Sequence, residues 1–167
     1  MHKSERSLFT RDMKDNQFDK ILQDFDTNAQ RVAQESAQKQ SEDASLLEKF
    51  TAHAKSQIEP ALSTIGLKVQ QYGHDHKVRF DDSKHSMAFE FFPKNIPISE
   101  FRRENTPILT FEWNARQRKV SLYSSNISPR RGGEGGPRGL FDLSAVTPEF
   151  VRERAMKLVE EVLSKQK

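Results

Sequence analysis

A short segment rich in glycine and arginine is the first place where this sequence could bind a charged ligand. Residues 129–139 hold five of the chain's seven glycines, together with Arg130, Arg131 and Arg138. Glycine-rich backbone can surround a phosphate group, and arginine can donate paired hydrogen bonds to it. No Gly-Lys-Ser/Thr ending follows, and Arg138 stands where a dinucleotide fold needs its third glycine. We therefore expect a flexible charged connector, with phosphate or nucleic-acid binding as the alternative.

A cluster of histidines and aspartates is the second candidate site. His74, Asp75 and His76 are consecutive, and Asp81, Asp82 and His85 follow closely. Imidazole and carboxylate groups together can hold a divalent ion, and alternate residues of a strand point to the same side. The spacing lacks the regularity of a strong metal site, and Gly73 and Asp75 are typical of a turn. We expect the polar rim of a hairpin and no tightly bound metal.

A third pattern concerns calcium. The run from Asp24 to Glu35, with Asp26 and Asn28 between them, resembles the calcium-binding loop of an EF-hand at its acidic positions. The resemblance covers twelve residues. Ala29 replaces the glycine that makes the sharp turn of that loop, where a positive φ is costly for a residue with a Cβ. We therefore expect a charged turn or helix surface here, with neither a metal nor another cofactor bound.

We find no recognisable arrangement of catalytic residues in the sequence. Serines and histidines are present without a local pattern that pairs a nucleophile with a base, and the adjacent Glu160 and Glu161 fall on the polar side of an expected helix. The absence of cysteine excludes disulfides, thiolate catalysis and cysteine-ligated metals. The protein is therefore expected to be non-enzymatic.

Composition bounds the size of the core and the class of partner. Hydrophobic residues make up 34% of the 167 residues, and the mean hydropathy is −0.81, which suggests one core plus an appendage. Charged residues make up 31%, yet the net charge is only +3, too small to drive strong binding to nucleic acid or anionic membranes. We find no apolar run of signal-peptide or membrane-span length, and expect a soluble, cytoplasmic protein that does not bind membranes.

The first 40 residues are expected to form a polar arm, helical or partly disordered. They hold seven basic and seven acidic residues. Phe18, Ile21, Leu22 and Phe25 fall at helical spacing and form one short apolar stripe, which we call the arm stripe. Since an isolated polar helix is marginal in water, the arm should be ordered when the arm stripe packs on the domain, on a partner or on a second copy.

Residues 41–167 are expected to form one domain that begins with a helix. Asp43 or Ser45 can cap this helix, and Gly66 is expected to end it after Ile65. Pro60 should kink or divide it. Its buried face is predicted to hold Leu47, Phe50, Ala54 and Ile58.

From Leu67 the apolar spacing changes to two residues, which predicts five strands. The alternating positions are Leu67/Val69, Val78/Phe80, Met87/Phe89/Phe91, Leu109/Phe111/Trp113 and Val120/Leu122. Short connections favour antiparallel hairpins, while Pro93 to Pro107 forms a longer crossing. After the flexible 129–139 connector, Thr147 should cap a last helix that begins with Pro148 and buries Val151, Ala155, Leu158, Val159 and Val162.

These elements predict an α+β fold in which N-terminal helices precede a five-stranded antiparallel meander and a C-terminal helix packs on one sheet face. The other face should be wet. Aromatic and basic residues there resemble the base-stacking surface of RNA-binding modules, although two glutamates weaken phosphate binding; the outward set is Tyr72, Lys77, Arg79, Glu90, Glu112, Ser121 and Tyr123.

Three functions therefore compete. The leading hypothesis is a protein-interaction module in which the arm stripe engages a protein partner or a second copy of the chain. The alternative is a nucleic-acid or phosphate binder that uses Arg130, Arg131, Arg138 and the basic strands, since residues 67–142 hold 13 basic against 9 acidic residues. The third is a small-molecule enzyme with a pocket between sheet and helices.

Overall fold

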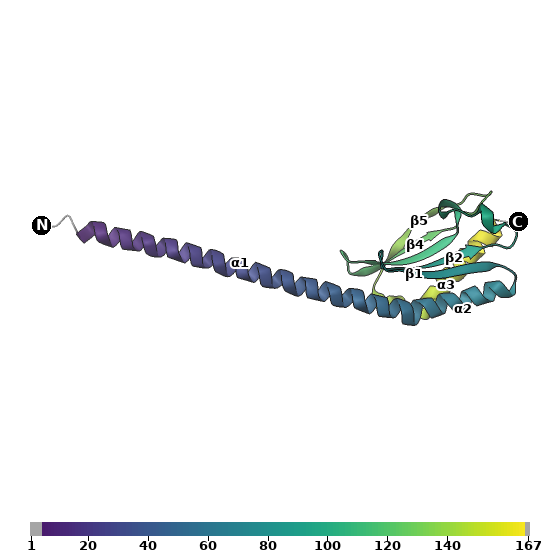
Figure 1. Ribbon diagram of the computed structural model, residues 1–167, viewed down its shortest axis with the longest axis horizontal. Coiled ribbons are helices and arrows are strands. Elements are labelled where there is room, and N and C mark those ends of the chain that lie inside the picture. The colour runs from purple at the N-terminus through teal and green to yellow at the C-terminus, as the bar shows by residue number, and fades with distance from the viewer. Residues whose placement is uncertain (1–4, 166–167) are drawn as a thin grey trace. The chain divides into compact units, whose positions relative to one another are not determined.

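The computed structural model describes the backbone of residues 5–165 and the side chains of residues 14–165. The chain divides into two units, Met1–Ala44 and Ser45–Lys167. The elements follow the order helices, sheet, helix (Figure 1): α1 (Glu5–His53), a π-helical turn (Ala54–Ile58), α2 (Glu59–Gln71), β1 (Asp75–Asp81), β2 (Ser86–Phe92), β3 (Ile108–Asn114), β4 (Lys119–Ser125), β5 (Gly135–Phe141) and α3 (Pro148–Ser164).

The α1 helix runs without a break past the position where a second helix was expected to begin. No glycine or proline occurs between residues 5 and 53, so nothing in the backbone ends the helix at Asp43 or Ser45. The predicted cap there is wrong. The predicted buried face is confirmed: Phe50, Ala54 and Ile58 are fully buried, and Leu47 packs against them.

Pro60 divides the helical segment as predicted. Its ring would clash with the carbonyl one turn earlier, and it has no N–H to donate. The chain therefore widens into the π-helical turn directly before α2, and Pro60 lies in the first turn of α2, where neither defect matters.

Gly66 does not end α2, contrary to the prediction. The helix continues through Gly66 to Gln71, and Gly66 instead faces the ring of His76 on β1. A Cβ at residue 66 would lie 2.1 Å from His76 Nε2, so only glycine allows helix and strand to approach this closely. Leu67 and Val69, predicted as a strand, lie in α2: Leu67 is 61% exposed and Val69 only 8%, as expected for helical neighbours on opposite sides.

The sheet is a five-stranded antiparallel meander in the order β1-β2-β3-β4-β5, so the predicted fold class is confirmed. The fifth strand comes from an unexpected place. Gly135 to Gly139, expected in a connector, form most of β5 and pair with β4, with a bulge opposite Leu122 and Tyr123. A Cβ on Gly135 would lie 2.8 Å from the Tyr123 hydroxyl, so this glycine allows close strand packing.

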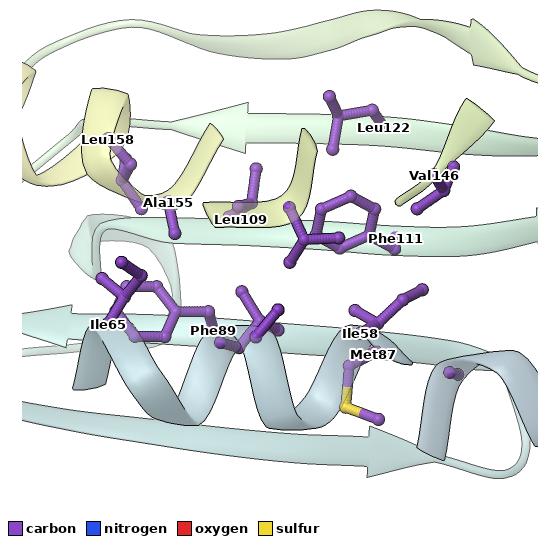
Figure 2. Close-up of a cluster of buried hydrophobic side chains, with 14 of the residues drawn as sticks. Ile58, Ile65, Met87, Phe89, Leu109, Phe111, Leu122, Val146, Ala155 and Leu158 are labelled. Atoms are coloured by element: carbon purple, nitrogen blue, oxygen red, sulfur yellow. The ribbon is translucent and has the colours of Figure 1, made fainter. Parts of the chain in front are cut away.

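Both α2 and α3 cover the same face of the sheet, and their apolar sides meet the inward residues of β2, β3 and β4 (Figures 1 and 2). Thr147 caps α3 as predicted: its hydroxyl accepts a hydrogen bond of 3.2 Å from the Phe150 N–H. The space between the layers is filled by side chains that include Ile58, Met87, Phe89, Phe111 and Leu158.

Candidate interaction surfaces

The arm stripe lies on one side of α1. At about 100° per residue, Phe18, Ile21, Leu22 and Phe25 fall within roughly one third of the helix circumference. Their exposed fractions in the single chain range from 48% for Leu22 to 70% for Phe25. Four large apolar side chains gathered and exposed in this way are typical of a surface that binds a partner.

The calcium-like pattern lies inside α1. Asp24, Asp26 and Asn28 are each two residues apart, so a helix turns successive members to opposite sides, whereas a calcium loop would bring their oxygens together. Glu35, the last acidic position, instead pairs with Arg31, whose Nη1 donates to Oε1 at 2.9 Å; Arg31 also donates to Asn28. The helix thus gives these residues the charged surface that the sequence indicated.

His74, directly before β1, and His76, on β1, face the helical layer. His74 lies 5.4 Å from the Phe91 ring, and His76 stacks on Phe89 at 6.1 Å. The Nδ1 atom of His74 accepts a hydrogen bond from the Lys94 N–H at 3.1 Å, while His76 Nδ1 is buried with no hydrogen-bond partner. Among residues 14–165, no three histidine or acidic side chains are placed to share a metal ion.

Electrostatics favour the neutral form of His74. Burial, and then the positive charge of Lys94, lower the pKa of His74 below its ordinary value. The hydrogen bond from Lys94 is consistent with this direction, because an unprotonated Nδ1 is required to accept it. Asp81, in the same predicted cluster, closes the β1–β2 turn by accepting from Ser83 and from the Lys84 N–H, and these hydrogen bonds lower the pKa of its carboxyl.

The three arginines of the glycine-rich segment contact three different parts of the domain. Arg130 forms an ion pair with Glu100 in the β2–β3 crossing. Arg131 donates to the Lys165 carbonyl at the end of α3, and Arg138 borders a small hollow beside α3 with Arg154 and Glu161. The glutamate raises the pKa of Arg130 through a hydrogen bond and its charge. The structure does not assemble these arginines into one phosphate cradle.

The open face of the sheet carries a shallow groove of about 730 Å³. Small side chains at its centre, Ser86, Ala88, Thr110 and Ser121, leave the hollow, and Tyr123 stands beside them. The groove's charges are mixed; its charged lining residues are Arg79, Lys84, Arg103, Asp81, Glu90, Glu104 and Glu112.

Two details of the open face bear on nucleic-acid binding. Arg79 is paired with Glu90, its Nη2 lying 3.1 Å from Oε1, so its charge is partly neutralised. Lys77 lies on the same face of β1, in a second hollow beside the groove. Tyr72, predicted on this face, lies instead at the end of α2, because the segment that holds it is helical and not a strand.

A second groove, which the sequence reasoning missed, lies between α2 and α3. This α2–α3 groove has a volume of about 380 Å³, and its walls are apolar: Ile65, Val69, Tyr72, Met156, Val159 and Leu163. Tyr72 and Met156 are 68% and 46% exposed. His74, Lys68, Lys94 and Glu160 also line it. Its signal was hidden because residues 67–72 were interpreted as a strand.

The third hypothesis from the sequence was an enzyme with a pocket between sheet and helices, and the described residues leave only a small hollow between the sheet and α3. The hollow there, between Leu109 and Leu122 on the sheet and Leu158 on α3, has a volume of about 20 Å³, too small for a substrate. Among the described residues, no helix combines the length and apolarity needed to cross a bilayer.

No family model, curated protein or solved structure matches this chain.

Proposed function

We propose that this protein is a non-enzymatic interaction module whose arm stripe binds protein. The observation that carries the proposal is the exposure of Phe18, Ile21, Leu22 and Phe25 on one side of α1. Burial of each of these side chains by a partner would contribute about 1.5–3 kcal/mol of hydrophobic free energy to binding. An apolar helix stripe with positions three and four residues apart suits a helix-in-groove contact.

A rigid domain suits this role. The sheet and its two helices form one packed core, so the domain can hold an arm without rearranging when the arm binds. The uninterrupted helix also supports the proposal, because a continuous helix keeps the four side chains in one line. Helical residues on the reverse side of α1 provide a matched control for any test.

Site-specific photo-crosslinking in cells that make the full chain tests the proposal. A photoreactive amino acid at Phe25 is compared with the same amino acid at Thr27, which lies about 200° away around the helix. The proposal predicts protein adducts from position 25, including adducts with a second copy, and few from position 27. Adding Leu22→Ser to the position 25 probe should reduce the adducts. Equal yields from both positions would contradict the proposal.

Nucleic-acid binding is the second candidate, carried by the surplus of basic residues between 67 and 142. The pairing of Arg79 with Glu90 and of Arg130 with Glu100 weighs against it, because paired guanidinium groups attract phosphate less strongly. Titration of labelled single-stranded RNA with the full chain at rising salt is the test. Submicromolar affinity that falls steeply with salt would favour this candidate over protein binding.

A further inference from the structure

The charges around the arm stripe have one prevailing sign. Residues 14–26 contain four aspartates and two lysines. On a helical projection, Asp15, Asp19 and Asp26 border one side of the stripe and Asp24 the other. Lys14 stands at its amino-terminal end, and Lys20 lies on the reverse side. The stripe is therefore an apolar ridge with mainly acidic borders, and its complement is an apolar groove with a basic rim.

The α2–α3 groove has this complementary character. Its apolar walls include Tyr72 and Met156, which are large and substantially exposed. Among the groove's polar lining residues, Lys68 and Lys94 contribute positive charge against one negative charge from Glu160, and His74 is the fourth. The Lys94 ammonium is held at the groove because Nζ donates to the Tyr72 carbonyl at 3.2 Å. The α2–α3 groove has a volume of about 380 Å³, which lies at the lower end of the range for binding pockets.

Two arm stripes have less complementary charges for each other than an arm stripe and an α2–α3 groove have. Two stripes face to face would bring their aspartate borders together, and like charges at the edges of a helix pair oppose association. Arm and groove instead offer opposite charges and matching apolar surfaces.

We propose that the α2–α3 groove binds the arm stripe of a second copy of this chain. The inference rests on the proposed function and names the partner. In a two-fold symmetric dimer each arm would occupy the other copy's groove, which gives two identical contacts. The two contacts share a single loss of translational freedom, so their combined affinity exceeds that of either alone.

Complementation between two full-length variants tests this arrangement. The arm variant carries Leu22→Asp and Phe25→Asp, and the groove variant carries Tyr72→Asp and Met156→Asp. All four positions are exposed in the single chain, so the fold should tolerate them. Leu67→Asp is the matched control, because Leu67 is exposed on α2 but does not line the groove. Circular dichroism verifies that each variant is folded, and light scattering gives its mass at concentrations up to about 100 µM.

The proposal predicts that wild type and Leu67→Asp dimerise and that each double variant has a dimer Kd raised at least about tenfold. An equimolar mixture of the two variants should recover heterodimers, because the intact arm of one fits the intact groove of the other. Addition of salt should weaken the wild-type dimer, since the borders carry opposite charges.

Other outcomes overturn the proposal and leave the proposed function separately decidable. A groove variant that stays dimeric while the arm variant becomes monomeric would show arm-to-arm pairing, which keeps the proposed function and excludes this partner site. A monomeric wild type would exclude self-recognition, and crosslinking from position 25 would then decide whether the arm binds a different protein.

Discussion

The two units of this chain use apolar side chains in opposite ways. Within Ser45–Lys167, phenylalanines such as Phe50, Phe89 and Phe111 are fully buried in one core. Within Met1–Ala44, Phe18 and Phe25 stay largely exposed although they are the same residue type. The difference teaches that hydrophobicity stabilises the fold only where a second layer faces it. In the arm, the same side chains are available for intermolecular contact.

The largest expected effect separates a core phenylalanine from an arm phenylalanine. Phe89→Ala should destabilise the domain by about 3–5 kcal/mol, because it leaves a cavity beneath α2. Phe25→Ala should change the free energy of unfolding by no more than about 0.5 kcal/mol. Urea unfolding at a concentration where the chain is monomeric measures both. A loss of several kcal/mol for Phe25→Ala would mean that the arm belongs to the domain's cooperative unit.

The contact between Gly66 and His76 should give the next largest effect. Gly66→Ala adds a methyl group 2.1 Å from His76 Nε2, and such overpacking costs about 1–3 kcal/mol, partly offset by about 1 kcal/mol of better helix propensity.

A double-mutant cycle isolates that contact. His76→Ala removes the ring, so Gly66→Ala should be far less costly, or even stabilising, in that background. Equal effects of Gly66→Ala in both backgrounds would show that α2 and β1 do not pack through this pair.

The arginines of the glycine-rich segment should matter less. Replacing Arg130, Arg131 and Arg138 together by alanine should lower the melting temperature by about 2 °C or less, because Arg130 and its Glu100 partner form an exposed ion pair. Differential scanning fluorimetry in low and high salt measures the change. The same triple variant should bind single-stranded RNA as weakly as wild type, and a flattened salt dependence relative to wild type would point to phosphate contacts.

The smallest effect is a pH dependence from His74. Its pKa is lowered in the folded state, so the folded chain binds fewer protons than the unfolded chain as the solution becomes acidic. The contribution of His74 to stability is therefore fully present above the ordinary histidine pKa of about 6.5 and is lost as pH falls through the lowered value.

Urea unfolding at pH 7.5 and pH 5 tests this sign. His74→Gln, which keeps an acceptor for the Lys94 N–H, should show a smaller loss of stability on acidification than wild type. A larger loss in the variant would contradict the inferred direction.

The elements with strong periodicity could be predicted from sequence. The alternation in residues 87–91, 109–113 and 120–122 predicted strands with the correct inward side, and Thr147 with Pro148 predicted the start of α3. Failures occurred where distant residues decide the outcome. Glycine is typical of a helix end, but residue 66 is a glycine because the ring of His76 on β1 leaves no room for a Cβ there.

The candidate sites were less predictable because they form where elements far apart in the sequence pair or pack against each other. Residues 135–139 have the composition of a loop, yet pairing with β4 makes them a strand. The α2–α3 groove joins Tyr72 to Met156 across more than eighty residues of sequence, and no local pattern links them. The arm stripe could be identified because helical spacing alone defines it, although its partner remains a proposal.

The two edge strands of the sheet, β5 and β1, carry features that disfavour the addition of further strands. A sheet edge with a regular row of free N–H and carbonyl groups invites strands from neighbouring molecules to extend it. At one end of this sheet, Pro137 offers no N–H and the bulge breaks the row. At the other, β1 carries the charged side chains of Asp75, Lys77, Arg79 and Asp81. Both edges thus disfavour backbone pairing with strands of neighbouring molecules, so contacts between copies would have to use side-chain surfaces.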